Sequence, residues 1–208
     1  MSLYIGLMSG TSMDGIDAAL IHSEKNQLLA GITIPYSSTL QKQLLDFDAS
    51  KKHTPQSLLT LNHHLGHAFS KAVLALLKQT NYQANDITAI GSHGQTLYHN
   101  PDAKIPTTLQ LGCPHTIATH TGITVVADFR TRDLVLGGQG APLAPFYHYE
   151  LFKNQDLPLA VVNIGGISNL SILNPSASPM GYDAGPGNVL MDTWIRKNQN
   201  LPYDKNGA

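Results

Sequence analysis

Two strand–turn–strand units with glycine-bearing turns constrain the fold of this chain more than any other feature. In the first unit, the polar turn 9–15 separates apolar runs over 3–8 and 16–21. The pattern recurs late in the chain, where Gly165-Gly166 joins two further strand-like runs. A tight turn of small residues exposes successive backbone N–H groups, which suits an anion such as a phosphate chain. Two such units, each opening a domain, predict a cleft that holds a triphosphate from both sides.

Either turn could also do no more than reverse the direction of the chain. A Walker phosphate loop is excluded at both places, because neither turn is followed by Gly-Lys-Ser or Gly-Lys-Thr. The turns on their own therefore leave a purely structural role open.

The composition excludes several classes of partner. Hydrophobic residues make up 42% of the 208 residues and charged residues 13%, and the net charge is −1, so nothing indicates binding to nucleic acid or to an anionic membrane. The chain has neither a signal-peptide pattern nor a run of about 18 apolar residues. Cys113 is the single cysteine, which excludes an intramolecular disulfide and fits a reducing compartment. We therefore expect a cytoplasmic protein that acts on small molecules.

The segments between and around the two units alternate between strand and helix patterns. A strand over 28–34 would complete an antiparallel meander, and a long helix should begin at the N-cap Thr54, with Pro55 in its first turn. The other predicted elements are strands over 87–92, 123–127, 159–164 and 168–173, and helices over 114–121, 143–151 and 189–197. This order predicts an α/β fold with a mixed sheet flanked by helices.

The same order predicts two domains of unequal size. The first domain should cover residues 1–155 and the start of a second should cover 156–208. Roughly 50 residues do not complete a second domain equal to the first. We therefore expect the second domain to be truncated.

Polar side chains follow two of the predicted strands. His93 and Gln95 come after one strand, and Asp128 and Arg130 come after the next. The carboxyl ends of parallel strands are where open α/β sheets bind ligands. His93 and Gln95 are hydrogen-bonding groups that suit sugar hydroxyls, although a histidine at a strand end is often only a satisfied structural group. Arg130 suits a carboxylate or phosphate, but with Asp128 and Asp133 beside it an internal ion pair is an equal alternative.

Asp183 is the acid that we single out as a candidate catalytic base. It comes just before Gly185-Pro186-Gly187-Asn188 and a helical pattern, so its carboxylate would lie near a helix N-terminus and stay ionised. An ionised aspartate beside a phosphate cleft can accept a proton from a hydroxyl or a water molecule. A simple helix cap is the alternative role.

Three histidines offer a different chemistry. His63, His64 and His67 lie in the predicted long helix, and His63 and His67 are one turn apart, which is a metal-ligand spacing. The glutamate that a zinc protease of this pattern needs is absent. A metal-dependent hydrolase is therefore a minor alternative, and Cys113 fits a small buried residue better than a nucleophile.

Six motifs, in order, resemble those of the anhydro-N-acetylmuramic acid kinase family, and the resemblance runs over essentially the whole chain. They are Gly10-Thr11-Ser12-Met13-Asp14-Gly15-Ile16-Asp17, Ser92-His93-Gly94-Gln95-Thr96, Ala127-Asp128-Phe129-Arg130, Gly137-Gly138-Gln139-Gly140-Ala141-Pro142, Asn163-Ile164-Gly165-Gly166-Ile167-Ser168-Asn169 and Asp183-Ala184-Gly185-Pro186-Gly187-Asn188. The resemblance implies an actin-like ATPase (ribonuclease H-like) fold and a homodimer.

The resemblance also implies an activity. It is the conversion of 1,6-anhydro-N-acetylmuramic acid, ATP and water into N-acetylmuramic acid 6-phosphate and ADP, with Mg²⁺ accompanying the ATP, in peptidoglycan recycling. The implied roles are ATP binding by Gly10, Thr11, Ser12, Met13, Asp14, Gly15, Ile16, Asp17, Asn163, Gly165 and Gly166, sugar binding by His93, Gln95, Arg130 and Asp183, and activation of water by Asp183. The resemblance names no metal ligand.

Two departures from the family pattern affect these expectations. Ala184 stands where many relatives carry a hydroxyl residue, which removes a hydrogen bond beside the proposed base. The family's C-terminal half, which completes the second domain and most of the adenosine pocket, is not part of this sequence. The chain alone is therefore expected to be inactive, and a non-catalytic sugar-binding or dimerising module is the main alternative.

Overall fold

The computed structural model describes residues 2–10, 13, 15–47, 52–201 and 203–205. The chain divides into two compact units, Met1–Gly140 and Ala141–Ala208. The sequence placed the boundary after residue 155. The helix α5 (Ala144–Phe152) packs against the strands that follow it, so the division falls before this helix rather than after it.

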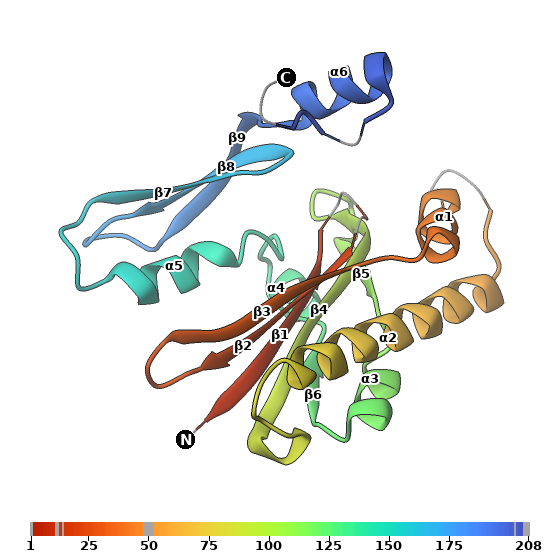
Figure 1. Ribbon diagram of the computed structural model, residues 1–208. Coiled ribbons are helices and arrows are strands. Elements are labelled where there is room, and N and C mark those ends of the chain that lie inside the picture. The colour runs from red at the N-terminus through yellow and green to blue at the C-terminus, as the bar shows by residue number, and fades with distance from the viewer. Residues whose placement is uncertain (1, 11–12, 14, 48–51, 202, 206–208) are drawn as a thin grey trace. The chain divides into compact units, whose positions relative to one another are not determined.

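The first unit is built on a mixed β-sheet (Figure 1). Its strands are β1 (Leu3–Ser9), β2 (Gly15–His22), β3 (Gln27–Pro35), β4 (Ile87–Asn100), β5 (Thr107–Leu111) and β6 (Val125–Ala127). The strands β1 to β3 form the expected antiparallel meander, and β4 runs parallel to both β1 and β6. The mixed sheet flanked by helices, as expected for an actin-like domain, is confirmed.

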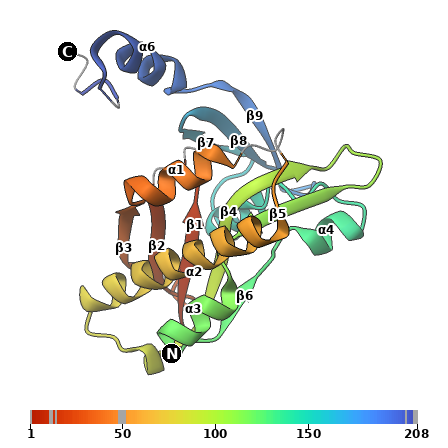
Figure 2. The same cartoon turned by 90° about the vertical axis from the view of Figure 1, so that its right-hand side faces the viewer.

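Helices cover one face of this sheet. They are α1 (Ser38–Asp46), α2 (Pro55–Lys78) and α3 (Pro114–Thr121), and Figure 2 shows α2 crossing in front of the strands β1 to β4. Thr54 caps α2 as predicted, because its side chain accepts a hydrogen bond from the Ser57 N–H. Leu65, Phe69 and Leu76 of α2 are fully buried against the sheet. The short helices η1 (Ala84–Asp86) and α4 (Thr131–Val135) complete the unit.

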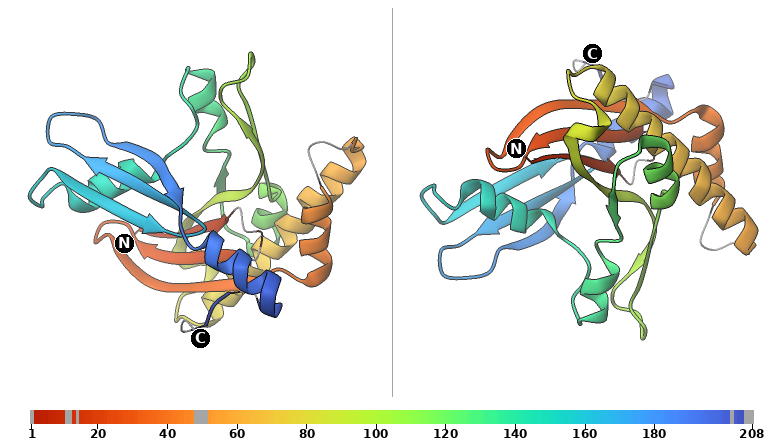
Figure 3. Two further views of the ribbon diagram at one scale, coloured as in Figure 1. Left: turned by 90° about the horizontal axis from the view of Figure 1, so that it is seen from above. Right: turned by 90° about the horizontal axis from the view of Figure 1, so that it is seen from below.

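The second unit is an antiparallel sheet with two helices. Its strands are β7 (Leu159–Ile164), β8 (Ile167–Leu173) and β9 (Met180–Pro186), and its helices are α5 and α6 (Val189–Gln199). Both views of Figure 3 show α5 lying along this sheet, where Nδ1 of His148 is 2.8 Å from Oγ of Ser171. The second strand–turn–strand unit is therefore present.

The structure differs from the sequence prediction in several elements. The helices α1 and α4 and the strands β5 and β9 were not predicted, and β4 continues to Asn100 rather than ending at Ser92. The extension pairs antiparallel with β5 from Gln95 to Asn100. Within the part of the chain that the structure describes, no helix is both long and apolar enough to cross a membrane.

Candidate functional site

The turn after β1 is held in place from a neighbouring strand. Gln95 of β4 is fully buried, and its Nε2 donates to the Gly10 carbonyl oxygen at 3.1 Å. The hydroxyl of Ser9 lies 2.7 Å from Oε1 of Gln95 and 2.6 Å from the Gly15 carbonyl oxygen. The Gly10 end of the turn is thus bonded to the buried amide directly, and the Gly15 end is bonded to Ser9, which contacts the same amide. Because that amide is enclosed, its clearest role in the structure is to brace the turn.

The middle of this turn is only partly described. Thr11, Ser12 and Asp14 lie outside the described residues. Met13 has a left-handed backbone with φ 53°, and its carbonyl oxygen accepts from Nε2 of Gln41 in α1 at 3.1 Å. At Gly15 a Cβ atom would lie 2.8 Å from the Ile34 carbonyl oxygen, so the approach of β3 requires glycine there.

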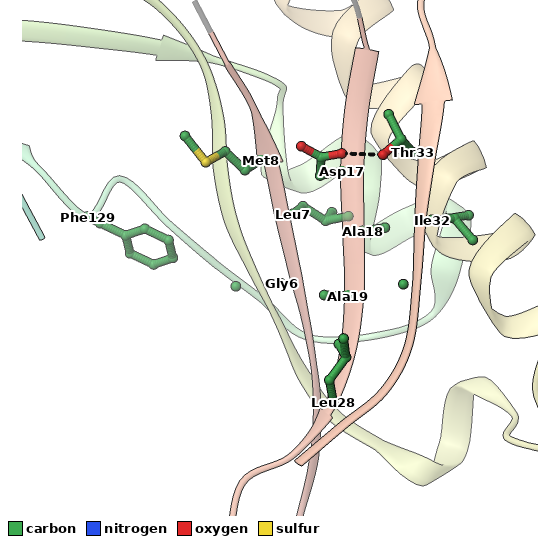
Figure 4. A pocket seen from close by; sticks show the side chains of 12 residues that line it. Gly6, Leu7, Met8, Asp17, Ala18, Ala19, Leu28, Ile32, Thr33 and Phe129 are labelled. Atoms are coloured by element: carbon green, nitrogen blue, oxygen red, sulfur yellow. Dashed lines mark hydrogen bonds between the residues drawn. The ribbon is translucent and has the colours of Figure 1, made fainter. Parts of the chain in front are cut away.

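Ile16 and Asp17 point to opposite faces of the sheet. Ile16 is 1% exposed, counting its side chain and its backbone together, and it belongs to the core, so the structure does not expose it to a ligand. Asp17 is exposed, and its Oδ1 accepts from the Thr33 hydroxyl at 2.6 Å (Figure 4). It lines an open hollow of about 560 Å³ on the sheet, together with Met8 and Phe129.

His93 and Arg130 form a hydrogen-bonded pair. The Nε and Nη2 atoms of Arg130 lie 3.1 and 2.9 Å from Nε2 of His93, and Nδ1 of His93 lies 3.0 Å from the Gly94 carbonyl oxygen. This arrangement needs one tautomer, in which Nδ1–H donates to Gly94 and the bare Nε2 accepts from Arg130. The internal ion pair weighed for Arg130 is not formed among the described residues, where Asp128 and Asp133 accept from backbone N–H groups instead.

Electrostatics favour the neutral imidazole. Burial is the main cause that lowers the pKa of His93, and the charge of Arg130 lowers it further, although the Gly94 hydrogen bond acts in the opposite direction. Burial also lowers the pKa of Arg130, but a guanidinium stays charged at neutral pH. The pair therefore presents a fixed cation.

The strand register explains how this pair arises. Ser92 pairs with Leu7 of β1 and with Ala127 of β6, which are parallel neighbours of β4. The sequence expected β4 to end here and was wrong about that end. The parallel pairing of β4 with β6 ends at Ser92 and Ala127. The polar segments that follow these two residues, beginning at His93 and at Asp128, therefore still lie side by side.

The second unit contains the Gly165-Gly166 turn. Asn163 pairs with Asn169 across the β7–β8 hairpin, and Gly165-Gly166 forms its turn. The Asn188 N–H donates to the Gly165 carbonyl oxygen and the Gly187 N–H to that of Gly166, each at 2.9 Å. The turn is therefore tied to the start of α6.

Asp183 lies in a strand, which corrects its expected place at the foot of a helix. It belongs to β9, pairs with Asn169 of β8 and is exposed. The helix α6 begins later, at Val189, with Asn188 as its N-cap. The strand leaves the carboxylate exposed, and the predicted effect of a helix dipole on Asp183 is not supported.

The three histidines of α2 do not form the metal site that the sequence left open as a minor alternative. Nε2 of His63 and Nε2 of His67 are 3.0 Å apart, while His64 lies 3.3 Å from Oε1 of Gln43. His120 of α3 packs against His67 with ring centroids 4.3 Å apart. No group of three or more His, Cys, Asp or Glu residues suited to a metal occurs among the residues with described positions.

Sequence reasoning assigned no role to two serines near these groups. Ser9 and Ser92 are 2% and 1% exposed, at the ends of otherwise apolar runs in β1 and β4. A serine at the end of an otherwise apolar run is the sequence signal that could have identified these two residues. A hydroxyl in such a place is often buried, and buried hydroxyls need hydrogen-bond partners.

A comparison with protein families and known proteins covers the whole chain. A family model described as "Anhydro-N-acetylmuramic acid kinase" matches residues 2–208. Proteins of that name from Legionella pneumophila (strain Corby) and Vibrio cholerae serotype O1 (strain ATCC 39315 / El Tor Inaba N16961) are 55% and 50% identical. The matches cover 100% and 98% of this chain but 57% and 55% of the relatives, so the chain spans little more than half of their length.

A solved structure shows a likeness in fold. It is titled "Reductive activator for corrinoid,iron-sulfur protein", and it matches 89% of this chain and 31% of its own with a TM-score of 0.50 and 14% identity. At that identity the likeness concerns the fold alone.

Proposed function

The chain belongs to the anhydro-N-acetylmuramic acid kinase family, and from that premise we propose that it forms the sugar-binding and part of the ATP-binding machinery of such a kinase. The reaction would turn 1,6-anhydro-N-acetylmuramic acid, ATP and water into N-acetylmuramic acid 6-phosphate and ADP, a step in peptidoglycan recycling. The chain spans 57% of the length of the Legionella pneumophila relative, and the proposal concerns the part of the kinase that this sequence contains.

The observation that carries this proposal is the pair of His93 and Arg130. A muramic acid sugar carries a lactyl carboxylate, and a guanidinium held by hydrogen bonds at 2.9 and 3.1 Å is suited to bind it. In this role Arg130 contacts the substrate. His93 and Gln95, expected from the sequence to bind the sugar, support the site through Arg130 and through Gly10.

The turn after β1 and the turn between β7 and β8 are the proposed ATP-binding segments. The braced segment from Gly10 to Asp17 would receive phosphate oxygens on backbone N–H groups, and Asn163, Gly165 and Gly166 would do the same in the second unit. Mg²⁺ would arrive with ATP. The carboxylates of Asp17 and Asp183 are exposed, and carboxylate oxygen is the ligand that Mg²⁺ prefers, so either residue fits that ion.

Asp183 is the proposed base. In the anhydro sugar the 6-oxygen is bonded to C1 and has no proton to lose. Water therefore attacks C1, the bond from C1 to the 6-oxygen breaks, and that oxygen takes the γ-phosphoryl group as ADP leaves. The exposed carboxylate of Asp183 would accept the proton from the attacking water.

The proposed reaction and the family resemblance also suggest a cellular location and an oligomeric state. A reaction that consumes ATP belongs in the cytoplasm, and we propose a homodimer as the working form from the family resemblance. A non-catalytic sugar-binding module remains the second candidate.

The experiment is ADP release from ATP in the presence of 1,6-anhydro-N-acetylmuramic acid. Three proteins are compared: this chain, a chimera that adds the C-terminal remainder of the Legionella pneumophila relative, and the chimera with Asp183→Asn. Turnover by the chimera alone supports the proposal. An inert chimera that still binds the sugar favours the non-catalytic module, and one that does not bind the sugar refutes the substrate assignment.

A further inference from the structure

His63 and His67 of α2 form a pair of imidazoles whose Nε2 atoms face one another. The two atoms are 3.0 Å apart, and the rings meet edge to face with their centroids 4.5 Å apart. Residues four apart in a helix lie on the same face, one turn above the other, so the helix itself sets this pairing. The contact is exposed, so an ion in solution can reach it.

The spacing of the two nitrogens suits a metal ion bound between them. Imidazole nitrogens bind transition metals at about 2.0–2.1 Å, and two such bonds at a right angle place the nitrogens about 3.0 Å apart. The observed separation is 3.0 Å. A hydrogen bond between the two rings has the same length, and in the metal-free chain it holds the pair in the geometry that the ion requires.

Thr116 of α3 supplies an outer contact of the kind that metal-binding histidines have. Nδ1 of His63 lies 3.0 Å from Oγ1 of Thr116, a residue that is 7% exposed. In the tautomer whose Nδ1–H donates to this oxygen, the lone pair of His63 is on Nε2, the atom that faces His67. Such donation from the second ring nitrogen orients a ligating histidine and raises its basicity.

The neighbouring groups limit the site to two protein ligands. His64 is engaged with Gln43, whose Oε1 lies 3.3 Å from its Nδ1, and the ring of His120 packs on that of His67 with centroids 4.3 Å apart. Among the residues with described positions, no third His, Cys, Asp or Glu completes a metal-binding group. Water would fill the other positions of the ion, so the affinity should be lower than that of a structural zinc site with four protein ligands.

We propose that His63 and His67 chelate a divalent transition-metal ion through their Nε2 atoms. Cu²⁺ and Ni²⁺ fit better than Zn²⁺, because ligands at a right angle suit a tetragonal ion and Zn²⁺ prefers a tetrahedron. Mg²⁺ does not fit, because it prefers oxygen ligands, so the site is distinct from the Mg²⁺ that accompanies ATP. The ion would clamp one turn of α2 and, through Thr116, hold α3 against that turn.

Calorimetry of the whole chain with Ni²⁺, without a histidine tag, tests the chelate. The unchanged chain should bind the ion, and either His63→Gln or His67→Gln should weaken the binding about a hundredfold, because a single imidazole lacks the advantage of two linked ligands. The matched control is His64→Gln, which removes a histidine from the same turn and should leave the affinity unchanged. Absence of binding, binding that persists in both pair variants, or an equal loss in His64→Gln overturns the proposal.

Thr116 variants and a spectroscopic probe test the geometry of the site. Thr116→Val removes the outer oxygen and keeps the shape of the side chain, so the affinity for Ni²⁺ should fall about tenfold, and Thr116→Ser should restore it. Equal affinity in these two variants would overturn the assignment of Thr116. With Cu²⁺, the hyperfine pattern of the electron paramagnetic resonance spectrum should show two nitrogen ligands in the unchanged chain and one in His67→Gln. A single nitrogen in the unchanged chain overturns the chelate.

The melting temperature gives a readout that does not depend on calorimetry or on kinase activity. An ion that binds the folded pair raises the melting temperature as its concentration increases. Ni²⁺ should do so for the unchanged chain and for His64→Gln but not for His63→Gln, and Mg²⁺ without ATP should not do so for any of them. A rise with Ni²⁺ that is equally large in His63→Gln would place the ion elsewhere and overturn the proposal.

Discussion

The Ser9 hydroxyl lies 2.7 Å from Oε1 of Gln95, and this contact joins the end of β1 to the middle of β4. Gln95 also donates to the Gly10 carbonyl oxygen at 3.1 Å, so one enclosed side chain sets the geometry of the turn that follows β1. The proposed phosphate-binding role of the turn depends on this contact, because backbone N–H groups bind an anion well only if they are oriented in advance.

Gln95→Leu should therefore lower both stability and nucleotide affinity. The substitution leaves the Gly10 carbonyl oxygen without its partner and the Ser9 hydroxyl with the Gly15 carbonyl oxygen alone, so the free energy of unfolding should fall by about 1–3 kcal/mol. Urea unfolding and ATP calorimetry measure the two effects. The control is Gln79→Leu at the exposed C-cap of α2, which should change neither. Unaltered stability in Gln95→Leu would contradict the bracing role.

The affinity for the anionic sugar should fall in acid. His93 must be neutral at Nε2 to accept from Arg130, and its pKa is lowered by burial and by that neighbour. Because the folded pKa lies below the unfolded one, the stability from the neutral imidazole is complete above about pH 6.5 and is lost as the pH falls toward the folded value. Calorimetry with the sugar from pH 7.5 down to pH 5 follows this loss.

Replacement of His93 distinguishes the cause of that loss. In His93→Gln an amide oxygen can accept from Arg130 without titrating, so the affinity should be largely retained and its pH dependence flattened. His93→Ala should weaken binding at every pH. A decline in acid that is identical in His93→Gln would assign the titration to another group.

Gly187→Ala should destabilise the second unit. A Cβ at this position would collide with the Gly165 carbonyl oxygen, and backbone atoms have little freedom to move away. We expect a loss of about 1–3 kcal/mol in the free energy of unfolding. Gly166→Ala is the matched control, because its Cβ would meet its nearest neighbours only at 3.9 Å. Equal effects from the two substitutions would contradict the tight packing of Gly187 on the turn.

Asp183→Asn in the chimera should abolish turnover while sugar binding persists. Loss of a general base costs about 10²- to 10⁴-fold in rate, and an amide of the same size keeps the exposed surface of β9. Steady-state kinetics and calorimetry report the two quantities. Asp192→Asn in α6 serves as the control and should turn over normally. Weakened binding with an unchanged kcat would make Asp183 a sugar contact rather than the base.

The sequence predicted most of the fold because hydrophobic periodicity and capping are local signals. Thr54 and Pro55 correctly predicted the start of α2, and three apolar runs predicted the antiparallel meander of β1, β2 and β3. The strand β5 and the extension of β4 were not predicted, since Thr107–Leu111 is polar and partly exposed, and its place comes from pairing with β4. Long-range pairing of this kind leaves little trace in a local pattern.

The candidate site was predicted in its residues but not in its contacts. His93, Gln95 and Arg130 stood out as polar groups after strands, but the sequence did not show that Gln95 is fully enclosed or that His93 accepts from Arg130. Ser92 stayed without a role, because only burial distinguishes it from any other serine. Asp183 was assigned to a helix start, because the glycine-rich segment from Gly185 to Asn188 and a helical pattern follow it in the sequence.

The hydrogen bonds of Arg130 also set the direction from which a ligand can reach it. A guanidinium has a side edge, made by Nε and one terminal nitrogen, and an end edge, made by the two terminal nitrogens. The imidazole of His93 occupies the side edge through Nε and Nη2. A carboxylate must then approach end-on, along the axis of the arginine side chain. In the proposed function, the histidine therefore sets the direction from which the sugar's carboxylate would reach Arg130 as well as the position of the charge.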